Sequence, residues 1–176
     1  QSAETLKKVT LELGGKSPFI VFDDANIDSA VNGSVAGIFA ASGQSCVAGS
    51  RLYLHDAIAD RFLAKMTAIA NSIRIGDPQA EDTQMGPLCT SAQIDHIEMQ
   101  VARAVEQGGR ILAGGRRVDG MDGLFFQPTI IECPYPSMEI VDTELFGPVL
   151  AVLRFSDEDD VIAPANRSVH GLAAGL

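Results

Sequence analysis

The segment SPFIVFDDANIDSAVNGSVAGIF at residues 17–39 contains a complete strand–helix unit and decides the fold class. Its first six residues, 17–22, are mostly apolar and β-branched or aromatic, as in a short buried strand. The DDAN sequence that follows supplies turn and N-cap residues. Apolar residues then recur at helical spacing, which predicts a helix that ends near Ser42 and Gly43, because Gly is a common helix terminator.

Three further helices are expected after this unit. The first three helices of the chain have apolar faces made by Ile27, Val31, Val35, Ile38 and Phe39, by Ile58, Phe62, Met66, Ile69 and Ile73, and by Ile94, Ile97, Val101 and Val105. Asp56 and Ser91 are the expected N-caps of the second and third helices. A last short helix opens at Asp157 and is limited or kinked by Pro164.

Short apolar runs between these helices predict further strands. They occupy residues 51–54, 110–112, 125–131 and 150–155. Gly, Pro and Asp residues mark a loop at 76–87 and a turn at 119–123. Because strands alternate with helices, we expect an α/β fold with a mostly parallel sheet flanked by helices.

Composition bounds the possible partners and the cellular compartment. The 176 residues fit one domain, and 46% of them are hydrophobic, enough for a sizeable core. A formal net charge of −10 disfavours nucleic acid and anionic membrane surfaces as partners. Three cysteines are too few for a disulfide framework, and no apolar run is long enough to span a bilayer. We therefore expect a cytoplasmic protein that binds neither nucleic acid nor a membrane.

Cys46 is the first candidate for chemistry. It lies in GQSCVAGSR, residues 43–51, where small neighbours allow the backbone to approach a ligand closely. By itself, a cysteine in such a place is either a small buried hydrophobic residue or a nucleophile. Cys89 and Cys133 have no comparable surroundings and are expected to be structural.

Two glutamates are further candidates. Glu12 lies between two Leu residues and beside two Gly, in VTLELGGK at residues 9–16. Burial there would disfavour its charged form and tune it as a general base, whereas the alternative is an ordinary Glu at a strand end. Glu144 precedes an aromatic residue and a Gly-Pro turn, so it either holds a ribose hydroxyl beside a flat ring or belongs to a turn with one core Phe.

Three motifs in order resemble those of the aldehyde dehydrogenase superfamily. LELGGKSP at 11–18 resembles its glutamate motif, GQSC at 43–46 its cysteine motif, and ELFGPV at 144–149 its nicotinamide-contacting motif. Further landmarks occur in the family's order at Gly86-Pro87, Gly114-Gly115, Gln127-Pro128-Thr129, Ala165-Asn166 and Gly171-Leu172. The resemblance covers essentially the whole chain and implies a catalytic, cysteine-bearing domain segment of an NAD(P)-dependent enzyme.

The resemblance assigns a role to each candidate residue. Cys46 matches the nucleophile that attacks the aldehyde carbonyl. The tetrahedral adduct then transfers hydride from the former aldehyde carbon to the nicotinamide, which leaves a thioester on Cys46. Its backbone N–H matches an oxyanion donor. Glu12 matches the base that activates water to release a carboxylic acid, which implies the hydrolytic branch. Glu144 matches the residue that holds the nicotinamide-side ribose, Phe146 the one that packs near the nicotinamide, and Leu13 one whose carbonyl contacts the carboxamide.

Three positions depart from the usual family pattern. Ala40-Ala41 stand where many members have Asn, although some branches also carry Ala-Ala there. Thr143 stands where a second Glu often precedes Glu144, and His170 stands where an aromatic residue is frequent. None of these departures removes a residue that the resemblance implicates in catalysis.

The resemblance also implies parts that residues 1–176 do not contain. Family members have a Rossmann-like cofactor domain before this segment and further residues after it. No Gly-x-Gly-x-x-Gly fingerprint occurs here, and both ends suggest cuts through a longer polypeptide. We expect the whole protein to be a homodimer or homotetramer that oxidises a small-molecule aldehyde with NAD or NADP, NAD being favoured. The segment alone is expected to be inactive.

Two other functions are compatible with part of this pattern. A Cys–His acyl hydrolase or transferase would need His55, His96 or His170 as the partner of Cys46, and it would leave Glu12 without a role. Activity without any nicotinamide cofactor would favour it. A non-catalytic scaffold with the same fold would have no reason to retain the cysteine, both glutamates and Phe146 together.

Overall fold

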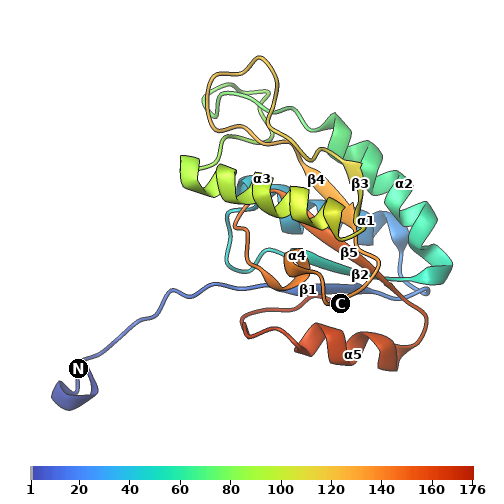
Figure 1. The fold of residues 1–176 in the computed structure, drawn as a ribbon, viewed down its shortest axis with the longest axis horizontal. Helices are drawn as coiled ribbons and strands as arrows, with labels where there is room; N and C mark the ends of the chain where they lie inside the picture. Colours follow the sequence, from blue (N-terminus) through green and yellow to red (C-terminus); the bar gives the residue numbers. More distant parts are fainter. Residues whose placement is uncertain (1) are drawn as a thin grey trace.

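A five-stranded sheet forms the centre of the chain, of which the computed structural model describes residues 2–176 (Figure 1). Its strands are β1 (Pro18–Val21), β2 (Arg51–His55), β3 (Arg110–Ala113), β4 (Thr129–Glu132) and β5 (Val149–Phe155), in the spatial order β1-β2-β5-β4-β3. All neighbouring pairs are parallel except β3 with β4. The expected α/β fold with a mostly parallel sheet is therefore confirmed.

Helices cover both faces of the sheet. They are α1 (Ile27–Phe39), α2 (Asp56–Ser72), α3 (Ser91–Glu106), α4 (Glu139–Asp142) and α5 (Glu158–Asn166), with short 3₁₀ turns η1 (Ala3–Thr5) and η2 (Ala40–Gly43). Side chains on β5 alternate between two apolar cores, as expected of a strand covered on both faces. Leu150 and Val152 join the core under α1 and α2, whereas Ala151 and Leu153 join the core under α3, α4 and α5. None of the helices in residues 2–176 is long and apolar enough to cross a bilayer.

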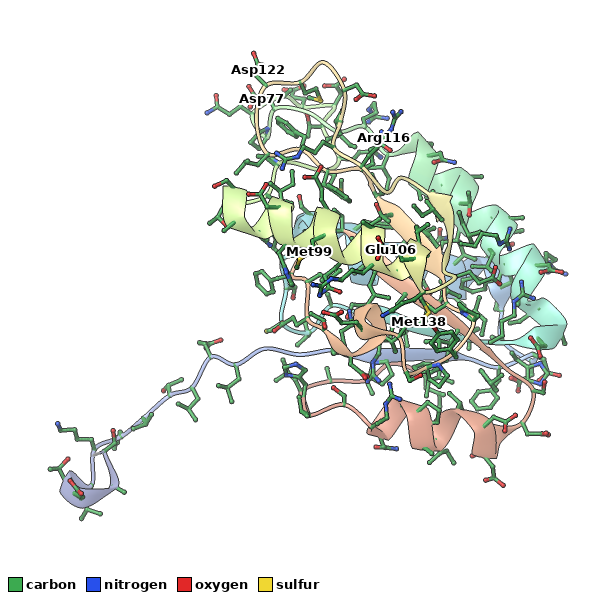
Figure 2. All side chains as sticks on the ribbon, in the orientation of Figure 1. Asp77, Met99, Glu106, Arg116, Asp122 and Met138 are labelled. Carbon is green, nitrogen blue, oxygen red and sulfur yellow. The ribbon has the colours of Figure 1, made fainter. Side chains whose placement is uncertain are left out.

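Two long connections lie together at one end of the molecule: residues 73–90 between α2 and α3, and residues 114–128 between β3 and β4. Figure 2 labels Asp77 on the first connection and Asp122 on the second, and both lie at that end. A backbone hydrogen bond of 2.8 Å from Leu88 N–H to the Leu124 carbonyl joins the two segments. The N-terminal residues instead lead away from the body of the fold as an extended tail, with Leu6 90% exposed (Figure 1).

The N-cap residues of two helices differ from those expected from the sequence, and that of α1 agrees. Asn26 caps α1 as expected and accepts from Ser29 N–H at 3.0 Å. The cap of α3 is Thr90 and not Ser91, because the Thr90 hydroxyl accepts from the N–H of the third helical residue at 3.2 Å. The cap of α2 is His55 and not Asp56, since His55 Nδ1 accepts from Ala57 N–H at 3.3 Å.

The strand expected at residues 125–131 is wrong in its first half. Gln127 N–H donates to the Arg116 carbonyl and Val118 N–H to the Phe125 carbonyl, each at 3.0 Å, so this part forms a small hairpin outside the sheet. Pro128 has no N–H to donate to a ladder, and β4 begins directly after it.

Two helix expectations also need correction. Helix α1 ends at Phe39 instead of continuing towards Ser42 and Gly43, which lie in η2. On α3, Val105 is 47% exposed, and the neighbouring Ala104 takes the buried position instead. The apolar periodicity located both helices but was wrong in their last turns. Helix ends fray, and the contacts of the following segment determine where a helix stops.

Candidate active site

The glutamate, cysteine and Glu144 motifs meet at one place in the fold. A β-carbon added to Gly14 would overlap the Glu144 carboxylate, and one added to Gly15 would overlap the Cys46 carbonyl. A β-carbon on Gly43 would overlap the Gly147 carbonyl in the same way. Gly15 and Gly43 are needed because backbones approach closely there, which only a residue without a side chain permits, and Gly14 leaves room for the Glu144 side chain. The three segments are far apart in sequence and together build one site.

Cys46 is presented at the tip of a tight turn just before β2. The Ala48 N–H donates to the Ser45 carbonyl at 3.1 Å and closes this turn around Cys46. The cysteine is half-buried. Within residues 2–176 its own backbone N–H has no hydrogen-bond acceptor, so this donor can point at a ligand. The turn therefore places a thiol and an unused N–H side by side.

The segment before Cys46 is held by the loop that follows α2. Gln44 Oε1 accepts from Cys89 N–H at 2.9 Å, and Gln44 Nε2 donates to the Pro87 carbonyl at 3.4 Å. Ser42 Oγ donates to the Gly86 carbonyl at 2.9 Å. Sequence reasoning did not single out Gln44, although its place two residues before Cys46 was a usable signal.

Backbone strain accumulates on the same segment. Ala41, Ser42 and Gly43 all have positive φ values, of 49°, 57° and 71°. Non-glycine residues rarely adopt this region, because the β-carbon crowds the following carbonyl. Consecutive residues in this conformation turn the chain sharply from the end of α1 towards Cys46. Such strain is found mainly where the surrounding structure fixes a functional geometry.

Glu144 and Phe146 form the second wall of the site. The Gly15 N–H donates to Glu144 Oε1 at 2.9 Å, so the glutamate motif fixes this half-buried carboxylate. Phe146 has a φ of 53° and is 43% exposed, and its carbonyl accepts from the Gln93 side-chain amide. An exposed aromatic ring on a strained backbone leaves an apolar surface beside an acidic group.

Glu12 and Leu13 lie on the extended tail just before this contact region. Leu13 is 65% exposed, and Glu12 is exposed as well, so the expected burial of Glu12 is wrong for this chain. The reason is that the tail around Glu12 leaves the body of the fold as an extended chain (Figure 1). Glu12 lies three positions before Gly15, so its α-carbon lies at most roughly 11 Å from that of Gly15, which packs against the Cys46 carbonyl.

The other cysteines do not share the surroundings of Cys46. Cys133 is buried, and burial raises the pKa of its thiol to about 12, which leaves almost no thiolate near neutral pH. Cys89 is exposed on the loop that holds Gln44. Their expected lack of a catalytic role stays a prediction.

The histidines are not hydrogen-bonded to a cysteine anywhere in the described part of the chain. His55 ends β2, which begins near Cys46 and runs away from it, and its Nε2 lies 3.0 Å from the Ser156 carbonyl. His96 lies on α3, and the backbone N–H of His170 donates to Ser168 Oγ. A Cys–His dyad is therefore poorly supported by this geometry.

The residues present fit the nicotinamide and its ribose, but they do not fit the pyrophosphate of a dinucleotide. Glu144 and the exposed faces of Leu13 and Phe146 suit a ribose hydroxyl and a flat ring. A pyrophosphate needs a glycine-rich turn that opens a helix. The β1–α1 connection instead carries Asp23 and Asp24 and no glycine, so its charge would repel phosphate.

Comparison with known proteins gives one consistent family. A family model described as the aldehyde dehydrogenase family matches residues 1–176. (Z)-2-((N-methylformamido)methylene)-5-hydroxybutyrolactone dehydrogenase from Acinetobacter baylyi is 51% identical over 176 residues, covering 99% of this chain and 36% of the relative. Betaine aldehyde dehydrogenase from Brucella ovis is 46% identical over 179 residues, covering 100% of this chain and 37% of the relative.

Solved structures agree with this family. PnpE is a protein from Pseudomonas sp. WBC-3. Its complex with nicotinamide adenine dinucleotide has a TM-score of 0.95 and 46% identity, covering 99% of this chain and 36% of PnpE. The NAD⁺ complex of aldehyde dehydrogenase from Bacillus cereus has a TM-score of 0.92 and 39% identity, covering 98% of this chain and 35% of that one. The chain thus spans little more than a third of the length of its relatives. With a family model matched from end to end and the same fold in solved members, the chain belongs to the aldehyde dehydrogenase family.

Proposed function

We propose that the protein containing this chain oxidises a small-molecule aldehyde to a carboxylic acid with NAD. The observation that carries the proposal is the convergence of three motifs, with Gly14 against Glu144 and Gly15 against both Cys46 and Glu144. NAD is named in the structures of PnpE and the Bacillus cereus enzyme, which supports an NAD-type cofactor. Residues 1–176 would be the catalytic, cysteine-bearing part of the enzyme.

Cys46 is the proposed nucleophile. Its thiolate adds to the aldehyde carbon, and the carbonyl oxygen becomes an oxyanion. The half-buried turn brings the thiol to a surface where a small substrate can reach it. The Cys46 N–H, which has no acceptor in the described part of the chain, would donate to that oxyanion.

Glu144 and Phe146 form the proposed binding site for the nicotinamide and its ribose. Glu144 would accept from a ribose hydroxyl while the Gly15 N–H donates to its Oε1, and Phe146 would support one face of the ring. The Leu13 carbonyl would accept from the carboxamide. When bound, NAD supplies the acceptor for the hydride that leaves the substrate carbon, and the acyl group stays on Cys46 as a thioester.

Glu12 is the proposed base for the second half of the reaction. A carboxylate near the thioester takes a proton from water, and the resulting hydroxide displaces the Cys46 sulfur and releases a free acid. The short span from Glu12 to Gly15, and from there to Cys46, keeps this carboxylate within reach. A second carboxylate is needed because the Glu144 side chain is already fixed by Gly15.

The whole protein is proposed to be a cytoplasmic homodimer or homotetramer. Three Leu or Val side chains of the tail, at Leu6, Val9 and Leu11, are more than half exposed in this chain. Apolar side chains in such a row need covering by other parts of the protein or by a second subunit. Size-exclusion chromatography with light scattering tests the assembly, and a monomer at working concentration would contradict it.

A direct assay tests the proposed activity. Purified full-length protein is incubated with a panel of aldehydes and either NAD or NADP, and the absorbance of the reduced cofactor is followed together with acid formation. We expect equal amounts of reduced cofactor and free carboxylic acid. Acyl release without any cofactor would instead support a hydrolase, and no turnover with any aldehyde would contradict the proposal.

A further inference from the structure

Two buried cations lie next to each other where β1 and β2 begin. The Lys16 side chain is 2% exposed and the Arg51 side chain 1%. Arg51 Nε donates to the Lys16 carbonyl at 2.7 Å, and its terminal nitrogens donate to Tyr53 Oη, the Pro164 carbonyl and the Ala165 carbonyl. All four acceptors are neutral, so they satisfy the N–H groups of Arg51 without cancelling its charge.

No acidic side chain in residues 2–176 forms an ion pair with either cation. Asp142 instead pairs with Arg167, and Glu144 accepts from Gly15 N–H. Burial and the neighbouring Arg51 lower the pKa of Lys16 to about 8, so the ammonium is still mostly charged at neutral pH. An unpaired charge in such a place is costly, and buried charges in proteins are normally paired.

The same two residues line a pocket of about 310 Å³ between β1 and the segment that follows α5. Ser17, Asn166 and His170 also line it, together with small apolar residues, and none of its lining residues is acidic. Ser17 is 4% exposed, and its hydroxyl has no hydrogen-bond partner within residues 2–176. In Figure 1 the segment after α5 turns back towards β1, and the Gly175 N–H donates to the Pro18 carbonyl at 2.9 Å. The pocket therefore combines positive charge with an unused buried hydroxyl.

We propose that this pocket binds a carboxylate group. One carboxylate oxygen would accept from the Lys16 ammonium and the other from the Ser17 hydroxyl, which neutralises one buried charge and satisfies one buried polar group. Arg51 offers little further donor capacity, because four contacts already occupy its N–H groups. A monovalent carboxylate fits so few donors better than a phosphate does.

The carboxylate has two possible sources, which share this chemistry. The matched relatives are much longer than this chain, and one source is an Asp or Glu side chain from the rest of the protein. A small free carboxylic acid can also enter a pocket of this volume. The site does not depend on the proposed dehydrogenase activity, because the argument rests on charge and burial alone.

The test measures the thermal unfolding midpoint of the full-length protein and of its Lys16→Met variant. Met keeps most of the buried stem and removes only the ammonium. Each protein is studied in sodium acetate and in sodium chloride of the same ionic strength. If a free carboxylate binds, the midpoint of the parent protein rises with acetate beyond the chloride value, and the variant loses this rise. If a side chain of the protein fills the site, acetate has no specific effect, and Lys16→Met lowers the midpoint because it leaves that carboxylate unpaired.

Two further variants complete the test, one as a control on the surface and one in the pocket. Lys65→Met is the control, since Lys65 is exposed and pairs with the exposed Asp28 on the surface, and its midpoint should hardly change. Ser17→Ala should shift the midpoint in the same direction as Lys16→Met. The proposal is overturned if both Lys16→Met and Ser17→Ala raise the midpoint while acetate behaves like chloride, because the pocket then holds no anion. Phosphate stabilises folded proteins in general, so only the part of a rise that Lys16→Met removes reports on the pocket. A larger rise of this kind in phosphate than in acetate would overturn the assignment to a carboxylate.

Discussion

At the scale of single residues, the chain separates its three cysteines by environment. Cys46 is half-buried at a turn, Cys89 is exposed on a loop, and Cys133 is buried with its pKa raised to about 12. The sequence alone singled out Cys46 by its small neighbours and by the motif around it. The family resemblance also implied that the Cys46 N–H is an oxyanion donor, but only the fold shows that this N–H has no acceptor within residues 2–176.

The nucleophile is tested by Cys46→Ser in the full-length protein. A neutral hydroxyl is a far weaker nucleophile than a thiolate, so we expect aldehyde oxidation to fall by at least on the order of a thousandfold. The measurement is the steady-state rate of reduced-cofactor formation. Cys89→Ser is the matched control and should keep most of the activity. Normal turnover by the Cys46 variant would rule out the proposed mechanism.

The proposed base is tested by Glu12→Gln, which keeps the shape of the side chain but cannot accept a proton. Thioester hydrolysis should slow more than the formation of reduced cofactor. Stopped-flow absorbance should therefore show a burst of about one reduced cofactor per active site, followed by a slow steady state. An unchanged steady-state rate would remove Glu12 from the mechanism. Glu4→Gln, on the same tail, serves as the control.

At the scale of elements, apolar periodicity located α1, α2 and α3 because each buries one face against the sheet. It could not locate α4, whose four residues are too few to show a period. It also overextended the strand before Pro128, because the two Phe residues there pack in a hairpin and not in the sheet. Tertiary contacts decided these segments, and local sequence carries little information about them.

The strained turn η2 gives a prediction about stability. Ala41 has a φ of 49°, a conformation that costs an Ala roughly 1–2 kcal/mol more than a Gly. Ala41→Gly relieves this strain but adds about 0.4–1 kcal/mol of chain entropy to the unfolded state. We expect a net gain of about 0.5–1 kcal/mol in the free energy of unfolding, measured by urea denaturation of the full-length protein.

Ala40 is the matched control for that substitution, since its φ of −56° is ordinary for any residue. Ala40→Gly should therefore lower the free energy of unfolding, because only the entropy cost remains. If Ala41→Gly destabilises the protein as much as Ala40→Gly does, the positive φ of Ala41 is not a source of strain.

At the scale of the whole molecule, the site is assembled by backbone approach more than by side-chain contact. Gly15 lets the glutamate motif lie against the backbone of Cys46, and Gly43 lets the cysteine motif lie against the backbone of Gly147. The order of motifs in the sequence predicted which residues would share a site. It could not predict that Glu12 is exposed, because exposure depends on which segments the fold brings against the tail.

The last prediction concerns residues 1–176 as an isolated chain. They carry the cysteine, the proposed base and the contacts for the nicotinamide end. Most dinucleotide affinity comes from backbone N–H groups that hold the pyrophosphate at a helix N-terminus. Here the β1–α1 connection is acidic and lacks glycine, so that contribution is missing. We expect isothermal titration calorimetry to detect no NAD binding below the millimolar range, and no dehydrogenase turnover.

Cys46 should still react with iodoacetamide in the isolated chain, because alkylation needs no cofactor and the thiol is only half-buried. Cys133 should not react in the folded chain at pH 8, since burial raises the pKa of its thiol to about 12. Mass spectrometry of the alkylated peptides distinguishes the two cysteines, and unfolding in urea before alkylation should make them equally reactive. Tight, stoichiometric NAD binding by the chain alone would contradict the calorimetric prediction. It would mean that residues 1–176 contain a complete dinucleotide site and that the rest of the protein is not needed to bind the cofactor.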